Sequence, residues 1–454
     1  MNKIFSVLAL FCCIFSLQAQ ENASASNTAP ARPERLVYTL QDCLRRGLEQ
    51  NLQLQVVRNE EQATHNNATL ANAGALPTID ATAAYRPNET LSEHSTARAT
   101  GEETSTSGVF DYGLNAGATL NWTIFDGFKI QTNHRQLKLL EQRGETDTRI
   151  AAEDLIADIS SEYYNYIQQI IRRAHYRYAL RLSRERLRIA ELNYQTGRFS
   201  GLDYHLARVD FNADSAQYVK QQQSVRNTLI KLNQLMSNPN IVQWINVPDS
   251  SIVIREDLML EPLWEQTLNA NSSLLRASQN TMSAELDYKK VLSRNYPYLK
   301  LNGQYAYNFN HYGESSVLKR DNQAISGGLT LGINIFDGNR RRERRNAQLA
   351  IENRKLQRDQ LEIDLHANLT TFWQAYNNNL QLLALQQQNL EIAESNLEIA
   401  MERYKLGEIS GFDMRQVQKS LLDAEERVLQ VQYDAKLCEI SLMQISGNIG
   451  YYLE

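Results

Sequence analysis

Proline and glycine are scarce over long stretches of this chain of 454 residues. Its eight prolines leave two wide gaps, one from Pro87 to Pro239 and one after Pro297, and residues 339–406 contain neither proline nor glycine. Because proline breaks helices and glycine weakens them, each gap has room for a very long helix. A helix over residues 339–406 would be roughly 100 Å long.

Long apolar runs are also absent after residue 20, where no segment approaches the ~18 apolar residues of a membrane-spanning helix. The mean hydropathy is −0.48. These two properties exclude a polytopic helical membrane protein but allow a membrane β-barrel, because the strands of a barrel alternate apolar and polar residues. The net charge of −5 gives no support for a nucleic-acid-binding protein.

Motifs of catalysis and metal binding are missing from the sequence. The seven histidines are scattered without an HExxH motif, and there is no phosphate loop, no GxGxxG after a strand and no nucleophile elbow. We therefore expect no enzyme activity, no catalytic residue, no cofactor and no metal site.

Residues 1–20 are typical of a signal peptide for export, with Lys3 ahead of a short apolar core. Residues 21–38 form a polar tail, which we expect to be disordered. Two of the four cysteines lie in the signal peptide, so the exported chain keeps Cys43 and Cys438. We favour two buried thiols over a disulfide, although an oxidising compartment would allow the pair to form.

The chain contains two copies of one plan. Residues 122–129 (WTIFDGFK) match residues 333–340 (INIFDGNR), and residues 194–203 (YQTGRFSGLD) match residues 404–413 (YKLGEISGFD). Matches in the same order and at nearly constant spacing indicate an internal structural repeat.

Each copy has the order helix, strand, loop, strand, long helix, tight turn and returning helix. The first repeat spans residues 39–240, an equatorial linker with a short strand spans 241–261, and the second repeat spans 262–454. The polar stretch 89–108 lengthens the first repeat, and we expect it to be an exposed loop. The expected bounds of the other elements are strands at about 78–86 and 110–125, a long helix at 128–196 and a tip at 197–203 in the first repeat, and strands at about 298–310 and 324–336, a long helix at 339–406 and a tip at 407–413 in the second.

The predicted strands alternate with a period of two. In residues 112–124 the even positions are mostly apolar, whereas the odd positions are glycine, asparagine and threonine, and residues 299–309 and 325–335 show the same alternation. A soluble sheet with one face on a core is one explanation. We favour membrane strands, because the second face is small and almost uncharged, as a water-filled channel requires, and aromatic residues lie near the strand ends.

The second long helix carries apolar residues on two sides. One seam follows a strict 4-3 spacing from Leu369 to Tyr404, as in a coiled coil, and Leu385, Ile392 and Ile399 form another. Two seams on one helix indicate neighbours on both sides, which suits a cylinder of helices better than a two-stranded coil.

Four membrane strands per chain predict an oligomer. Four strands cannot close, and an open sheet edge in lipid leaves backbone groups unpaired at a cost of several kcal/mol each. Two chains would form an eight-stranded barrel filled by side chains, whereas three would form a twelve-stranded barrel with room for water. The small residues of the inner face favour a homotrimer, in which the long helices form a second barrel below the strands.

The chain resembles the TolC-type outer membrane efflux proteins over nearly all of the exported sequence. The resemblance is carried by the doubled Phe-Asp-Gly motif at 125–127 and 336–338, by the doubled Tyr-x-x-Gly-x-x-Ser-x-x-Asp turn and by the opening residues 39–51 (TLQDCLRRGLEQN). It implies a mixed α/β channel-tunnel: a homotrimer with a twelve-stranded barrel among outer membrane lipids and a long α-helical barrel in the periplasm. It also implies a periplasmic adaptor protein and an inner-membrane transporter as partners, in efflux or type I secretion.

The same resemblance assigns functions to the two turns, which become the periplasmic tips of the channel. The residues expected to dock the adaptor are Gly197, Arg198, Phe199, Ser200, Gly407, Glu408, Ile409 and Ser410. By the resemblance, Asp413 lines the pore aperture, and Gln416 stands where a second acid is expected. Tyr404 and Asp203 resemble a latch that holds the channel closed, although Ile409 replaces its basic partner. Helix capping by the same glycines, serines and aspartates explains much of the motif without any gate.

Two further questions stay open on the sequence alone. A periplasmic coiled-coil adaptor or scaffold without a pore would also contain long helices, although it would not need four alternating strands. The arginine-rich run at residues 340–345 suits either the solvated start of a helix or contact with lipid phosphates at the inner leaflet.

Overall fold

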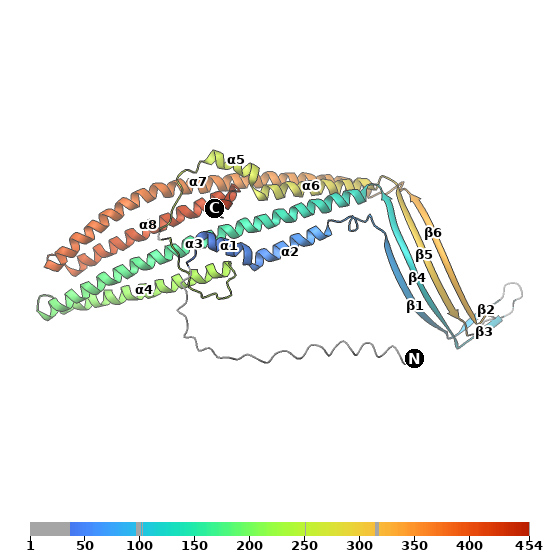
Figure 1. Ribbon diagram of the computed structural model, residues 1–454, viewed down its shortest axis with the longest axis horizontal. Coiled ribbons are helices and arrows are strands. Elements are labelled where there is room, and N and C mark those ends of the chain that lie inside the picture. Colours follow the sequence, from blue (N-terminus) through green and yellow to red (C-terminus); the bar gives the residue numbers. More distant parts are fainter. Residues whose placement is uncertain (1–36, 97–100, 102, 250, 314–316, 454) are drawn as a thin grey trace, which may run out of the picture.

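The structure is a computed structural model (Figure 1), and it describes residues 37–453 except 97–100, 102, 250 and 314–316. The predicted signal peptide at 1–20 and the tail up to residue 36 lie outside the described residues. The helices are α1 (Leu40–Gln50), α2 (Leu52–Asn67), α3 (Lys129–Gln195), α4 (Gly201–Leu235), α5 (Leu260–Ala270), α6 (Ser272–Ser293), α7 (Arg340–Leu406), α8 (Gly411–Ile445) and the 3-10 helix η1 (Ile449–Leu453). The strands are β1 (Thr78–Thr90), β2 (Glu93–Thr96), β3 (Glu103–Thr106), β4 (Val109–Asp126), β5 (Tyr298–His311) and β6 (Lys319–Gly332).

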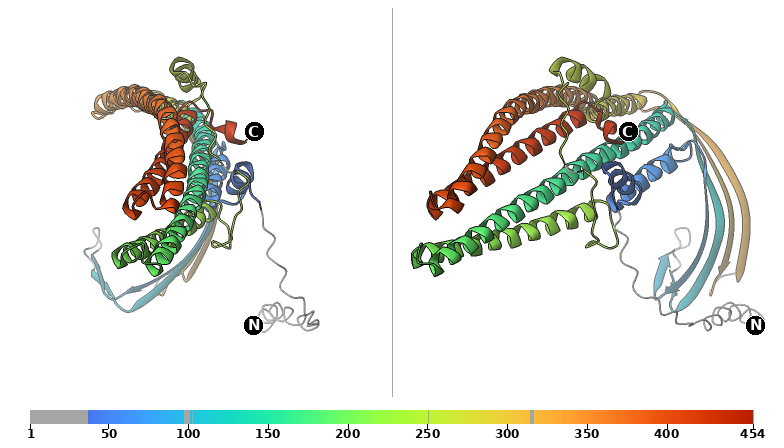
Figure 2. Two further views of the ribbon diagram at one scale, coloured as in Figure 1. Left: turned by 90° about the vertical axis from the view of Figure 1, so that its left-hand side faces the viewer. Right: turned by 60° about the vertical axis from the view of Figure 1, so that its left-hand side comes forward.

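The two repeats contain matching helices. α3 and α7 have 67 residues each, α4 and α8 have 35 each, and α1 and α5 have 11 each. α4 folds back along α3, α8 folds back along α7, and α3 also packs against α8 (Figure 1, Figure 2). The two hairpins therefore form a layer in the order α4, α3, α8, α7, with α4 and α7 at its edges. None of the helices in the described part of the chain is long and apolar enough to cross a membrane.

The strands β1, β4, β5 and β6 form an antiparallel sheet, in that order, at one end of the helices (Figure 1). The cross-strand register keeps the apolar residues on one face, as in the row Ala81, Ala118, Tyr305 and Ile325. A row on the opposite face consists of Ala84, Asn115, Asn308 and Asn322. Within the described residues, β1 and β6 each have one neighbouring strand, so both edges of this sheet are open.

Two strands differ from the predicted bounds. The strand expected at 78–86 continues through Pro87 to Thr90, because β1 is an edge strand and tolerates a residue without a backbone N–H. The strand expected at 324–336 instead spans Lys319–Gly332. Its partner β5 begins at Tyr298, opposite Gly332, so the residues after Gly332 have no strand beside them.

Two irregular segments also differ from the prediction. The polar stretch 89–108 was expected to be a loop, but it contains the paired strands β2 and β3, with Glu93 opposite Thr106. The short strand expected in the linker 241–261 is wrong for its described residues, which contribute one isolated bridge, between Val37 and Asn246.

The largest apolar core lies where the linker crosses the middle of α3. Ile245 of the linker is buried there beside Tyr163 and Tyr166 of α3. The Tyr166 hydroxyl donates a hydrogen bond of 2.8 Å to the Ile245 carbonyl oxygen, and the Tyr163 hydroxyl donates one of 2.8 Å to the Asp249 carboxylate. The linker is thereby fixed across the long helices by side chains rather than by strand pairing.

Both cysteines of the described chain are free thiols. Cys43 is fully buried in the same core, and Cys438 is half-buried beside Asn379. Burial raises the pKa of the Cys43 thiol to about 12, so this thiol is protonated and unreactive at neutral pH.

The doubled Phe-Asp-Gly motif packs differently in the two repeats. Gly127 has a left-handed backbone with φ of +68°, and a Cβ atom there would lie 2.2 Å from the Ser293 carbonyl oxygen. Phe128 packs edge-on against Phe125 and Tyr296 beside it. A Cβ atom on Gly338 would meet no atom within 4 Å. The first copy of the motif is therefore a packed corner, whereas the second is an open one.

Gly127→Ala is expected to lower the free energy of unfolding by at least about 2 kcal/mol, because alanine is strained in this conformation and its methyl group meets the Ser293 carbonyl. Gly338→Ala should lower it by less than Gly127→Ala does, because a Cβ atom on Gly338 meets no atom of its own chain. Chemical denaturation of the purified proteins in detergent, followed by circular dichroism, measures both. Equal losses in the two variants would contradict the difference between the two corners.

Candidate functional site at the hairpin tips

Both long helices end at a glycine with a left-handed backbone. Gly197 has φ of +76° and Gly407 has φ of +79°. The N–H of Gly407 donates to the Tyr404 carbonyl oxygen at 3.1 Å, and the N–H of Gly197 donates to the Tyr194 carbonyl oxygen at 3.0 Å. These bonds satisfy carbonyls that the helix ends leave free, so both glycines act as helix C-caps.

The returning helices begin with a reciprocal cap. The Asp203 N–H donates to the Ser200 hydroxyl oxygen at 3.2 Å, and the Ser200 N–H donates back to the Asp203 carboxylate at 3.0 Å. Ser410 and Asp413 repeat this arrangement at 3.1 and 3.3 Å. The plan that the two turns share is therefore explained by capping, and each aspartate side chain remains exposed.

Asp413 and Gln416 lie one turn apart on the same face of α8, and both are exposed. Both line a groove of about 530 Å³ between α7 and α8, together with Arg403 of α7 and Arg427 of α8. The structure thus brings the two candidate aperture residues together, in a groove that also contains positive charge.

Tyr404 is buried beneath the tip of the other hairpin, where Phe199 packs against it with ring centroids 6.3 Å apart. Burial raises the pKa of Tyr404; the Arg186 guanidinium opposes this rise and the Asp203 carboxylate adds to it. Tyr404 and Asp203 therefore lie close enough to interact electrostatically. The hydrogen bonds of the Asp203 carboxylate, however, come from Ser200.

The remaining tip residues divide into an exposed and a packed group. Arg198 and Glu408 are exposed, and Glu408 pairs with Arg403 at 3.2 Å. Phe199 and Ile409 pack against the apolar cluster around Tyr404. Ile409, which replaces the basic latch partner, thus makes an apolar contact with this cluster and also lines the groove between α7 and α8.

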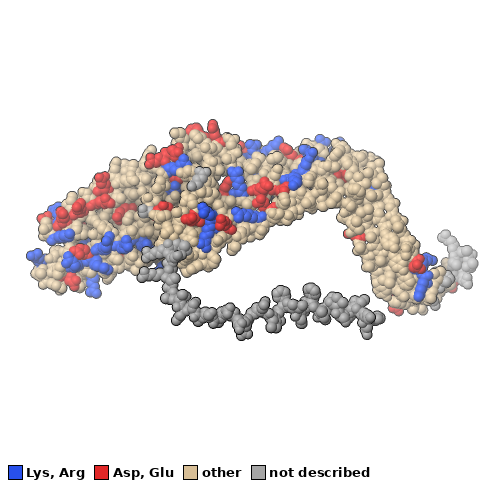
Figure 3. Space-filling model, viewed as in Figure 1, with Lys and Arg blue, Asp and Glu red and all other residues tan. Residues whose placement is uncertain are grey.

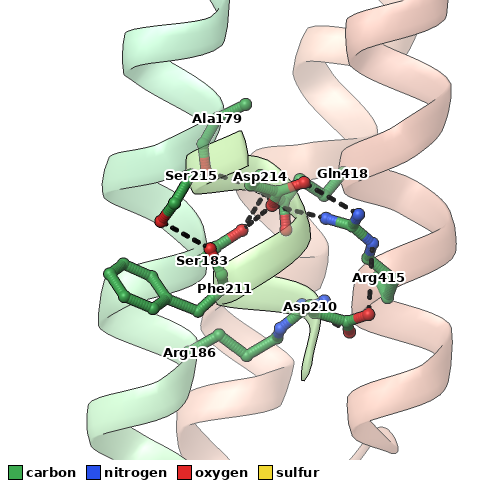
Figure 4. Close-up of polar contacts among 9 residues, drawn as sticks. All are labelled: Ala179, Ser183, Arg186, Asp210, Phe211, Asp214, Ser215, Arg415 and Gln418. Atoms are coloured by element: carbon green, nitrogen blue, oxygen red, sulfur yellow. Dashed lines mark hydrogen bonds and ion pairs between the residues drawn. The ribbon is translucent and has the colours of Figure 1, made fainter. Parts of the chain in front are cut away.

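A polar network beside this cluster joins the two hairpins (Figure 4). The Arg415 guanidinium of α8 binds the Asp214 carboxylate of α4 in a bidentate pair, at 2.6 and 2.8 Å. Asp214 also accepts a hydrogen bond from Ser183 of α3. The Gln418 amide donates to the Ser183 hydroxyl at 2.9 Å and to the Ala179 carbonyl oxygen at 2.9 Å. These contacts tie α8 to both helices of the first hairpin.

Arg186 extends the network toward the tip. Its guanidinium pairs with Asp210 at 2.7 Å, and Arg415 lies 3.8 Å from the same carboxylate. Arg186 is almost fully buried, and its Nε and Nη1 atoms have no hydrogen-bond partner among the described residues. Burial lowers the pKa of Arg186, because the interior stabilises its charge less than water does.

None of the residues of this network is among the site residues predicted from the sequence, although α3 contains a signal for it. Ala179, Ser183, Arg186 and Ala190 are all buried at 4-3-4 spacing. Polar residues at core positions of a coiled coil need partners, so Ser183 and Arg186 could have marked an inter-helix site.

A second groove, of about 710 Å³, lies between α3, α7 and α8 and is lined by Glu394 and Glu425. Burial first, and then the carboxylates of Glu394 and Glu426, raise the pKa of Glu425 to about 7. His175 lies 3.8 Å from Glu425, but burial and Arg172 lower the pKa of His175, so it is neutral at pH 7 and does not compensate the carboxylate.

Most of the chain has the fold of outer membrane channels of known structure. The channel CmeC of Campylobacter jejuni matches with a TM-score of 0.73 and 18% identity, over 90% of this chain and 85% of that chain. VceC of Vibrio cholerae matches with a TM-score of 0.69 and 16% identity, over 90% and 96% of the two chains. The open state of MtrE of Neisseria gonorrhoeae matches with a TM-score of 0.64 and 15% identity, over 96% and 99%. No curated protein sequence is significantly similar to the chain.

The sequence also matches the family model of the outer membrane efflux proteins, over residues 44–238 and 263–448. These two segments lie within the two repeats and cover most of the chain. The chain belongs to the outer membrane efflux protein family. It is an efflux channel of the outer membrane, and family membership argues against the alternative of a scaffold without a pore.

The Arg415–Asp214 pair is expected to couple the two hairpins by about 2 kcal/mol. The side chain of Asp214 is 10% exposed and that of Arg415 is 29% exposed, so the pair is screened less than a surface pair. A double-mutant cycle with Arg415→Met and Asp214→Asn, measured by urea unfolding, gives this energy. The exposed Arg403–Glu408 pair is the control, with an expected coupling below about 1 kcal/mol. Equal coupling energies in the two pairs would contradict the prediction that the network couples the two hairpins.

Glu425 should make the hairpin packing depend on pH. The pKa of Glu425 is raised to about 7 in the folded protein, so folding favours the protonated form and stability falls as pH rises from about 4.5 to 7. Glu425→Gln removes the titrating group and should abolish this loss of stability, which for a pKa raised from 4.5 to about 7 totals on the order of 3 kcal/mol. Thermal unfolding between pH 5 and 8 measures it, with Glu402→Gln in the same groove as the control. An unchanged slope in Glu425→Gln would refute the assignment.

Proposed function

We propose that three copies of this chain assemble into a channel-tunnel through the outer membrane and the periplasm, in which the strands and the helices each form a complete ring. The observation that carries this proposal is the four-stranded sheet, which has a largely apolar face, with charged residues only at the far ends of β1 and β6, and two open edges. An open edge in lipid would leave a row of unpaired backbone groups, so β6 of one copy needs β1 of the next. Three copies give twelve strands and leave space for water inside, which two copies would not.

The helical layer supports the same assembly. Leu385, Ile392 and Ile399 on the edge helix α7 are between 54% and 60% exposed in the single chain. On the other edge, α4 exposes Leu202 and Leu206. Packing α7 of one copy against α4 of the next buries both apolar edges and closes a ring of helices around the central axis.

The tips form the periplasmic end of this assembly. We infer that they dock a periplasmic adaptor protein, through the residues 197–200 and 407–410, and that the adaptor connects the channel to an inner-membrane transporter. The channel itself catalyses no reaction. It opens when the adaptor binds the open state more tightly than the closed one, because a ligand shifts an equilibrium only by its preference between the two states.

The gate is proposed to have an apolar and a polar part. Asp413 and Gln416 of three copies would surround the aperture, and Tyr404 and Asp203 would hold the tips together beside the packed Phe199 and Ile409. Asp413 supplies the negative charge that a cation-selective aperture requires. The Arg415–Asp214 pair is a further contact that must rearrange if the second hairpin moves away from the first.

The test is the single-channel conductance of the purified protein in planar bilayers, for wild type and Asp413→Asn. We expect a small, cation-preferring conductance in wild type and a loss of cation preference in the variant. Ser410→Ala is the control, because it weakens the same helix cap and keeps the carboxylate. Light scattering in detergent should give the mass of three chains. A mass other than that of three chains would overturn the trimer, whereas selectivity unaffected by Asp413→Asn would remove only the aperture assignment.

A further inference from the structure

The start of α7 contains five arginines and one glutamate in residues 340–345, next to the sheet. The side chains of two of these arginines donate hydrogen bonds to other residues of the chain. Arg340 donates a hydrogen bond of 2.8 Å to the Asn334 carbonyl oxygen, and Arg344 donates one of 3.2 Å to the Tyr288 hydroxyl. These two side chains have a structural function at the junction between strand and helix.

The other three arginines, Arg341, Arg342 and Arg345, are exposed, and no hydrogen bond or ion pair joins them to another described residue. We call them the junction arginines. The one nearby acid of the run, Glu343, is already paired with Arg294 at 2.5 Å. Residues three and four apart lie on one side of a helix, so Arg345 is next to both of the others. The result is a cluster of three uncompensated positive charges.

Helix stability does not explain this cluster. The first turn of a helix has a partial positive charge, so Arg341 and Arg342, which lie in the first turn of α7, do not stabilise the helix by their charge. A cluster of exposed arginines without an acidic partner in its own chain is a basic patch, and such a patch attracts a partner of negative charge from outside the chain. An anion is the partner that their charge and their planar, bidentate geometry fit.

The surroundings of the cluster point to a membrane surface. Ile335 and Phe336, just before α7, are 89% and 87% exposed. The aromatic pair Phe128 and Tyr296 is also exposed at this junction, with ring centroids 5.6 Å apart. Beyond it the sheet is a band with few charged residues up to the far end of the strands (Figure 3). The order apolar band, aromatic side chains, arginines matches the order acyl chains, interface, phosphates of a lipid leaflet.

We propose that the junction arginines bind the headgroups of anionic phospholipids in the leaflet that faces the helical part of the protein. Their position at that leaflet rests on the proposed function, which places the sheet in the membrane. The anionic lipids would hold the start of α7 at a fixed depth, where the strand meets the helix.

The experiment compares lipid binding by the full-length protein in mixed micelles that contain phosphatidylglycerol or phosphatidylcholine. Native mass spectrometry counts the lipids retained. Each arginine at a membrane surface contributes about 1 kcal/mol, so the variant Arg341→Gln/Arg342→Gln/Arg345→Gln should bind phosphatidylglycerol roughly a hundredfold more weakly. Binding by wild type should also weaken at high salt.

The matched control is Arg354→Gln/Lys355→Gln/Arg358→Gln, which removes three exposed charges from the same helix about 20 Å further from the sheet. It should bind both lipids as wild type does, and circular dichroism verifies that both variants fold. Equal binding of the two lipids by wild type, or equal losses in the two variants, would overturn the proposal. A conductance measurement separates the lipid proposal from the channel proposal. If the protein conducts but shows no preference between the two lipids, only the lipid site is refuted.

Discussion

The structure depends on the burial of one helix, α3, against partners from both repeats. α3 packs against α4 of its own hairpin and against α8 of the other, and its middle carries Tyr163 and Tyr166 in the largest core. Because α3 is the only helix of the four in the hairpin layer that contacts both α4 and α8 extensively, it fixes the order of the layer and leaves α4 and α7 as free edges. The exposed seams on these edges, and hence the proposed trimer, follow from that order.

The contact between the hairpins changes in character along its length. In the middle it is an apolar core crossed by the linker, and near the tips it is a polar network followed by an apolar cluster around Tyr404. A polar contact of defined geometry can be broken and re-formed, because water replaces the lost hydrogen bonds, whereas an apolar core resists separation. The polar network is therefore the part of the contact that the proposed opening can rearrange most easily, while the core at the middle keeps the two hairpins joined.

The two repeats share a plan but differ where their local surroundings differ. Gly127 is packed under the Ser293 carbonyl and Gly338 is not, although both belong to the same sequence motif. The basic run of residues 340–345 has only a weaker counterpart at the start of α3. The order of elements is therefore symmetric, while the contacts that adapt each repeat to the tip, the junction and the sheet edge are not.

The sequence alone determined the repeat, the long helices, the alternating strands and the capped turns, because periodicity and turn chemistry act between residues that are close in the chain. It could not determine the extension of β1 through Pro87 or the early end of β6, because these depend on which strand lies alongside. Among the candidate site residues, Asp203 and Asp413 were readable from their motifs, but Arg415, Asp214 and Arg186 were not. The Arg415–Asp214 pair joins the two hairpins, and the Arg186–Asp210 pair joins the two helices of the first hairpin. These residues are far apart in the chain, and only the tertiary structure decides which polar side chains face one another.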